Sequence, residues 1–140
     1  NIEALYCSNT LITKIPKEYT KLKTLHCNNI YIETLHETYI ELEELNVENT
    51  NISTIPNTFT KLKKLICSKT NLKPLPEELV NIEYLDIHDT PRYDDDITWE
   101  QMNESIDNIP VTYKNLKNLI ITNTKIKINV KDFPLLESVE

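Results

Sequence analysis

The sequence contains no glycine, and this absence excludes whole classes of site. The phosphate-binding loop of P-loop NTPases and the dinucleotide-binding turn of Rossmann folds both need glycine, because the backbone there approaches the ligand closely or takes a positive φ. Arginine is nearly absent too, since Arg92 is the only one. No apolar run approaches the ~18 residues of a membrane span, and the first residues do not have the pattern of a signal peptide. Nucleotide binding by these loops and a membrane span are therefore not expected.

Length and charge narrow the expectations further. The 140 residues suit one compact domain, and 42 of them are Leu, Ile, Val or Phe, so a real core can form. The formal net charge is −7. Nucleic acid and anionic membranes repel such a chain, so we expect neither as a partner.

The chain is an internal repeat with a period of about 20 residues. Turns begin near residues 2, 22, 42, 62, 82, 116 and 136, and the one longer gap, between 82 and 116, holds an insertion at about 91–104. Residues at the same position of successive turns form a column, and several columns hold apolar residues in nearly every turn, which establishes the repeat. The clearest column lies three residues after each start: Leu5, Leu25, Leu45, Leu65, Leu85, Leu119 and Val139.

The spacing within one repeat predicts a strand and a return path. Two apolar columns sit two residues apart, as in LYC, LHC and LNV, which is the period of a strand with one buried face. The next strand comes a full period later, which suits parallel stacking after a return segment. An apolar residue before the next strand, such as Tyr19, Phe59 or Leu79, suits a 3₁₀ or α turn. No single repeat can bury its apolar edge alone, so neighbours must stack.

The pattern L-x-x-L-x-C-x-N-T-x-I-x-x-I-P resembles the leucine-rich repeat in its short form of about 20 residues. It is carried by LEELNVENTNISTIP (residues 42–56) and LKKLICSKTNLKPLP (residues 62–76). The resemblance spans residues 1–140 outside the insertion. It implies an α/β or mostly β solenoid with parallel strands on a concave face and short 3₁₀ or α turns on the convex side. The residues of the insertion themselves predict one helix added to this solenoid. Asn, Ile and Lys occur 16, 18 and 14 times, and these amino acids have A/T-rich codons. This bias and the repeat pattern are similar to those of repeat proteins from large DNA viruses and some protists.

Two turns depart from the family pattern. Threonine stands where the family usually has a buried Asn ladder, and its hydroxyl can donate to backbone carbonyls between turns. In the second repeat Ile30 replaces this Thr, which puts the backbone pairing of that repeat in question. In the sixth repeat Asn129 and Val130 replace Ile-Pro. No polar capping repeat is visible at the start, and the sequence stops within a repeat, so we expect a segment of a longer protein.

The three cysteines predict buried, reduced thiols. Cys7, Cys27 and Cys67 all fall in an inward column. Cys27 and Cys67 are two strands apart, roughly 10 Å, which exceeds the ~7 Å that a disulfide spans. Reduced thiols favour a reducing compartment such as the cytoplasm. A ladder of repeats spreads ligands along an axis, so we expect no metal and no cofactor.

The outward strand positions are the predicted partner-binding surface. Their charge alternates by repeat, so rows of Glu and Lys can neutralise one another across the sheet. His88 lies near Asp86 and Asp89, but no positioned nucleophile accompanies it, so a polar surface is favoured over an acid–base pair. The predicted contact residues on this face are Tyr6, His26, Ile66, Tyr84, Asp86, His88 and Ile120.

The insertion, PRYDDDITWEQMNE, contains the only Trp, Arg and Met. Thr98 and Gln101 have capping-box spacing, which predicts a short helix from Trp99 to about Ile106. Its apolar face can simply seal the helix onto the solenoid, or Arg92, Tyr93 and Trp99 can serve as contact anchors.

These patterns predict a non-catalytic module that binds a protein partner through the concave strand face and the 91–104 insertion. Two alternatives stay open. The chain can be an assembly scaffold that contacts copies of itself or neighbouring subunits. It can also be the substrate-recognition part of a larger enzyme, such as a ubiquitin ligase.

Overall fold

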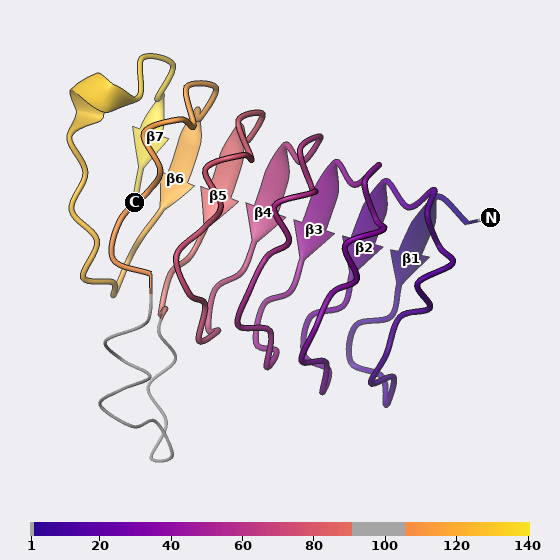
Figure 1. The fold of residues 1–140 in the computed structure, drawn as a ribbon. Helices are drawn as coiled ribbons and strands as arrows, with labels where there is room; N and C mark the ends of the chain where they lie inside the picture. The colour runs from indigo at the N-terminus through magenta and orange to yellow at the C-terminus, as the bar shows by residue number, and fades with distance from the viewer. Residues whose placement is uncertain (1, 91–105) are drawn as a thin grey trace.

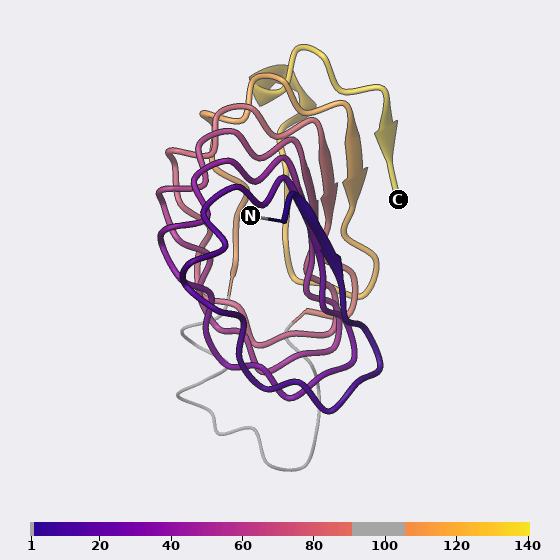
Figure 2. The same cartoon turned by 90° about the vertical axis from the view of Figure 1, so that its right-hand side faces the viewer.

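Residues 2–90 and 106–140 are described by a computed structural model, in which they form a solenoid of short strands (Figure 1). Figure 2 shows the strands gathered on one side of the coil and the connecting segments returning on the other. Each turn contributes one strand: β1 (Ala4–Tyr6), β2 (Thr24–His26), β3 (Glu44–Asn46), β4 (Lys64–Ile66), β5 (Tyr84–Asp86), β6 (Asn118–Ile120) and β7 (Ser138–Val139).

Every strand pairs in parallel with the next one along the chain, so sheet order follows chain order. Leu25 lies opposite Leu5 on one side and Leu45 on the other, so equivalent positions of successive turns stack. The second repeat pairs like the others although Ile30 replaces Thr, so the questioned pairing is intact. Leu85 lies opposite Leu119, which shows that the residues inserted after β5 leave the register unchanged.

The apolar columns form the core between the strands and the return segments. In the inner turns these side chains are almost fully removed from water, while Ile2 and Ile12 of the first turn remain exposed. This gradient is the expected result of stacking, because each turn is covered by its neighbours. In the column three residues after each start, the leucines with no exposed surface are Leu25, Leu45, Leu65, Leu85 and Leu119.

A tight turn follows each of the first six strands, and it needs a residue in the left-handed region. With no glycine available, other residues take a φ between 51° and 58°. Asn and Asp tolerate this conformation because their short polar side chains bond locally, whereas a long side chain is strained there. Lys69 is therefore the exception in the row: Asn9, Asn29, Asn49, Lys69, Asp89 and Asn123.

The Thr column acts mainly within its own turn, which corrects the expectation of bonds between turns. The Thr50 hydroxyl donates to the Val47 carbonyl at 2.8 Å, and the Thr70 hydroxyl donates to the Cys67 carbonyl at 2.6 Å. Of the predicted column, Thr90 alone reaches back to the preceding turn, where the Cys67 carbonyl lies 3.4 Å away. The hydroxyl thus closes the tight turn that carries the positive φ.

Most bonds from a side chain to the backbone of another turn lie instead where the return segments lead back to the sheet. The Tyr39 hydroxyl donates to the Ile15 carbonyl at 2.8 Å, and the Tyr113 hydroxyl donates to the Pro76 carbonyl at 2.8 Å. The Thr58 hydroxyl donates to the Glu37 carbonyl at 2.8 Å. Each bond satisfies a carbonyl of the preceding turn, so these side chains hold neighbours together as well as fill the core.

The predicted helical turns on the convex side are not confirmed. Chain reversals there are single hydrogen-bonded turns, for example from the Tyr19 N–H to the Pro16 carbonyl at 3.1 Å. Within residues 2–90 and 106–140 the structure has one 3₁₀ helix, η1 (Val130–Asp132), and no α-helix. It forms in the repeat that lacks Ile-Pro, and the Asn129 side chain accepts from the Lys131 N–H to cap it. The predicted helix of the insertion falls on residues 91–105, outside the described residues.

One column, the residue just before each strand, alternates in charge at every turn. Lys23 donates to Glu3 at 3.1 Å, Lys63 donates to Glu43 at 2.7 Å, and Lys117 donates to Glu83 at 2.7 Å. These pairs are exposed, so solvent screens them and each adds little to the stability of the fold. The charged rows do neutralise one another across the sheet, as predicted. The whole column is Glu3, Lys23, Glu43, Lys63, Glu83, Lys117 and Glu137.

Candidate functional site

The outward side chains of the first five strands form a continuous row, which we call the strand-face row: Tyr6, His26, Glu44, Lys64 and Tyr84. At its centre one carboxylate oxygen, Glu44 Oε1, accepts from His26 Nε2 and from Lys64 Nζ, each at 3.0 Å. At one end the Tyr6 ring packs edge-to-face on His26, with centroids 5.0 Å apart. At the other end Lys64 Nζ lies 5.7 Å from the centre of the Tyr84 ring. The row is thus held in place by its own members.

Electrostatics supports this order. The hydrogen bond from Lys64 holds the pKa of the Glu44 carboxyl below its usual value, and His26 lowers it further. Glu44 therefore stays charged at neutral pH, with the Lys64 ammonium and the His26 ring both bonded to it. A surface whose side chains are already held in place loses less conformational entropy when a partner binds.

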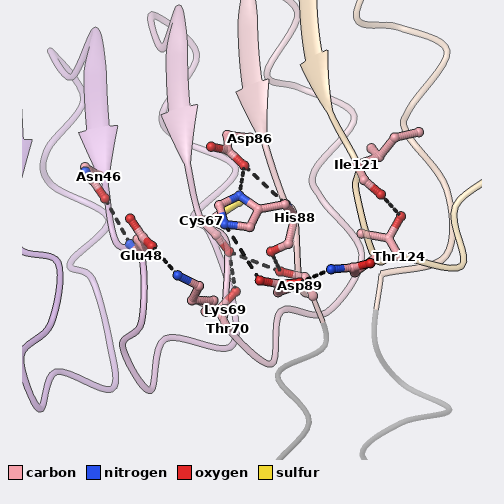
Figure 3. Close-up of polar contacts among 12 residues, drawn as sticks. Asn46, Glu48, Cys67, Lys69, Thr70, Asp86, His88, Asp89, Ile121 and Thr124 are labelled. Carbon is pink, nitrogen blue, oxygen red and sulfur yellow. Dashed lines mark hydrogen bonds and ion pairs between the residues drawn. The ribbon is translucent and has the colours of Figure 1, made fainter. Parts of the chain in front are cut away.

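A second cluster lies next to the row on β4, β5 and β6, and we call it the Asp86 patch: Ile66, Tyr84, Asp86, His88 and Ile120. Asp86 Oδ1 accepts from His88 Nδ1 at 2.6 Å and from the His88 backbone N–H at 3.2 Å (Figure 3). The sheet register places Ile66 and Ile120 on either side of Asp86. The carboxylate therefore lies between two aliphatic side chains, with the imidazole as its polar neighbour.

Asp89 and Lys69 mark the edge of this patch. His88 Nε2 lies 3.9 Å from Asp89 Oδ2, so two carboxylates share one imidazole. On the adjacent turn, Lys69 Nζ donates to Glu48 at 3.1 Å, on the side away from Asp89 (Figure 3). Negative charge is therefore neutralised around β3 and β4 but exceeds positive charge around β5.

Serine, histidine and aspartate occur together here, but not in a catalytic arrangement. Ser68 lies one turn before His88 and has no exposed surface, and its hydroxyl has no hydrogen-bond partner among residues 2–90 and 106–140. A nucleophile needs both a base in contact and access to a substrate. The buried Ser68 hydroxyl has neither, so it is not a nucleophile poised for attack.

The three cysteines are free and buried, as their column predicts. Burial raises the pKa of each thiol, in the case of Cys27 to about 12. Thiolate is the reactive form, so burial in the core disfavours the reactive state of all three groups.

The predicted contact residues fall into three sets. The structure brings together Ile66, Tyr84, Asp86, His88 and Ile120 in the Asp86 patch. Tyr6 and His26 contact each other but lie at the far end of the strand-face row. Arg92, Tyr93 and Trp99 lie outside the described residues.

Glu44 and Lys64 were not among the predicted contact residues, although they join the two ends of the row. Their opposite charges at one column of adjacent repeats were the available signal. Asp86 is more buried than we expected. Its place in the outward column predicts exposure, yet only 8% of its surface is accessible.

Neither a metal site nor a membrane-spanning helix is found in the described part of the chain. Among residues 2–90 and 106–140, no group of three or more His, Cys, Asp or Glu side chains is arranged to hold a metal ion. In the same ranges, no helix has the length and apolar character to span a membrane.

Comparison with known proteins gives a likeness in fold. No family model matches the sequence, and no curated protein matches it. Among solved structures, a leucine-rich repeat protein of Leptospira interrogans superimposes with a TM-score of 0.75 at 21% identity. The match covers 100% of this chain and 37% of that protein, so the chain spans little more than a third of its length. The likeness shows a parallel-strand solenoid built from short leucine-rich turns.

Proposed function

We propose that this chain, a solenoid with the leucine-rich-repeat fold, is a non-catalytic module that binds a protein partner through its strand face and the 91–104 insertion. One observation carries the proposal: the outward side chains of five adjacent strands form an ordered row, from Tyr6 on β1 to Tyr84 on β5. The row continues into the Asp86 patch, which adds aliphatic surface from Ile66 and Ile120.

The chemistry of this face suits a protein better than other ligands. Aromatic and aliphatic side chains alternate with paired charges, which is the mixture found at protein–protein interfaces. Tyr6 is 67% exposed at an outward strand position, so a large ring is available for contact. A polyanion would meet Glu44, Glu48, Asp86 and Asp89, which would repel it.

The experiment is a quantitative pull-down with mass spectrometry on three forms of the chain. They are the native sequence, a form lacking Pro91–Glu104, and a strand-face form with Ile66→Glu and Ile120→Glu. A matched control carries Thr54→Glu, on an exposed position of a return segment. Thermal unfolding of each form checks that it is folded.

The proposal expects at least one protein that the native and Thr54→Glu forms capture equally and the strand-face form loses. Loss on deletion as well assigns part of the contact to the insertion. Capture that is unchanged by both the strand-face substitutions and the deletion would contradict the proposal.

Association with copies of itself is the second candidate, and exposed apolar side chains on the end turns favour it. Ile2 and Ile12 are exposed on the first turn, and Leu135 and Val139 on the last. The alternating charge column opposes this candidate, because end-to-end stacking in register would place Glu137 of one copy beside Glu3 of the next. Sedimentation velocity decides the matter: a monomer at high micromolar concentration would exclude self-association.

A further inference from the structure

Asp86 occupies a position where the fold does not favour a carboxylate. The equivalent residues on the two neighbouring strands are Ile66 and Ile120, and both are partly exposed. Asp86 is the buried member of this column among the described strands, with 8% of its surface accessible. Placing an ionised group between aliphatic side chains costs free energy unless its partners compensate.

Asn46 shows which part of this side chain the fold needs. Its side-chain oxygen accepts from the Glu48 backbone N–H at 3.0 Å, just as Asp86 Oδ1 accepts from the His88 backbone N–H at 3.2 Å. A neutral amide therefore performs the same task at the end of β3. The same tight turn also follows Ile66 and Ile120, which have no side-chain acceptor, so nothing in the turn calls for a negative charge at this position.

The described residues around Asp86 leave one of its carboxylate oxygens available to a ligand. Both hydrogen bonds that Asp86 makes with described residues go to Oδ1, and neither goes to Oδ2. The lysine of the strand-face row, Lys64, already bonds to Glu44. Asp89 adds a second carboxylate near His88, and the Tyr84 ring adds an aromatic face.

We propose that the Asp86 patch binds a partner segment that presents an arginine or lysine side chain between aliphatic residues. Asp86 accepts the cation, and the segment's aliphatic side chains pack on Ile66 and Ile120. The Tyr84 ring contacts the alkyl stem or the cationic head. The two isoleucines exclude water around the pair, and this strengthens a charged hydrogen bond at the centre of an interface. This inference rests on the proposed function and names the chemistry of the partner.

The test uses the full chain and a displayed library of random 12-residue peptides. Peptides are selected on the immobilised native chain, and the affinities of those enriched are measured for the native, Asp86→Asn and Glu43→Gln forms. Asp86→Asn keeps the acceptor that Asn46 shows to be sufficient, so we expect it to fold. Glu43→Gln is the matched control, because it removes a carboxylate that is paired with Lys63 and belongs to neither the strand-face row nor the Asp86 patch. An Ile120→Ser form tests the apolar rim without touching Asp86.

The expected result is a set of peptides with a basic residue flanked by aliphatic ones. They should bind Asp86→Asn at least about tenfold more weakly than the native chain, and Glu43→Gln within about twofold of it. Replacing the basic residue of a peptide by norleucine should cause the same loss on the native chain and little further loss on Asp86→Asn.

Three outcomes would overturn the inference. One is an enriched set without basic residues, another is equal affinity for the native and Asp86→Asn forms, and the third is a selection that enriches nothing. Peptides that bind Ile120→Ser more weakly but do not need a basic residue would overturn this inference only. Recognition of a partner by the strand face would still be supported. Peptides whose affinity is unchanged by both Ile120→Ser and Asp86→Asn would contradict both the inference and strand-face recognition.

Discussion

Lys69 is the residue whose replacement we expect to stabilise the protein. Its backbone has a φ of 52°, in the left-handed region that Asn occupies at the equivalent positions of four other turns. This conformation costs an ordinary side chain about 1–2 kcal/mol, and Asn less, because its side chain bonds locally. Lys69→Asn should therefore recover about 1 kcal/mol of backbone strain.

The substitution also removes the pair between Lys69 and Glu48, so the two effects must be separated. The side chains are 43% and 28% exposed, and such a pair is worth at most about 1 kcal/mol. Salt screens exposed pairs but leaves backbone strain unchanged. In about 0.5 M NaCl the gain should appear nearly undiminished, as a rise in melting temperature of about 3 °C.

Urea and thermal unfolding followed by circular dichroism measure this difference. Lys63→Asn is the matched control, because Lys63 is paired with Glu43 at 2.7 Å but is not among the residues with positive φ. It should bring no gain. Asn49→Lys should lose stability in the opposite sense. If Lys69→Asn were neutral or destabilising in high salt, strain in the tight turn could not be the reason.

The remaining predictions concern the core, the thiols and the response to acid. Leu65→Ala should lower the free energy of unfolding by about 2–5 kcal/mol, because it empties a fully buried position; an unchanged melting temperature would show that the register is wrong. The three thiols should not react with Ellman's reagent at pH 8 until urea is added, since burial raises the pKa of each; rapid labelling of the native chain would contradict their placement. Hydrogen bonds from Lys63, Lys64 and Lys117 lower the pKa of Glu43, Glu44 and Glu83. The stabilisation that these ion pairs give the fold is complete above pH 4.5, the ordinary pKa of the Glu carboxyl in the unfolded chain, and is lost as the pH falls through the lowered pKa values of the folded chain. The melting temperature should therefore drop in acid, and the drop should be smaller in high salt. A melting temperature that stayed constant into acid would contradict those pairs.

The repeat could be predicted from the sequence because many equivalent positions indicate it. Each apolar column has five or more members at one spacing, so a single departure such as Ile30 does not hide it. The same redundancy located the insertion. The Ile106 N–H donates to the Leu72 carbonyl at 2.9 Å, so Ile106 resumes the column that Leu72 belongs to.

Features that depend on a single side chain could not be predicted in this way, because no equivalent positions support them. The Thr50 and Thr70 hydroxyls bond to the carbonyl three residues back in their own turns, and the spacing of the repeat does not distinguish that bond from one between turns. Return segments form single turns where helical ones were expected, since so short a repeat leaves little chain between the return path and the next strand. The burial of Asp86 depends on the neighbouring side chains of β4 and β6, and strand periodicity predicts only which face a residue lies on.

The most direct test of strand-face recognition is the dissociation constant of the captured protein for two single variants, Ile120→Glu and Thr54→Glu. Both introduce one carboxylate at a position that is not fully buried, the first on the strand face and the second on a return segment. Strand-face binding predicts an affinity at least about tenfold weaker for Ile120→Glu and unchanged for Thr54→Glu. Equal affinities, or a loss confined to Thr54→Glu, would contradict it.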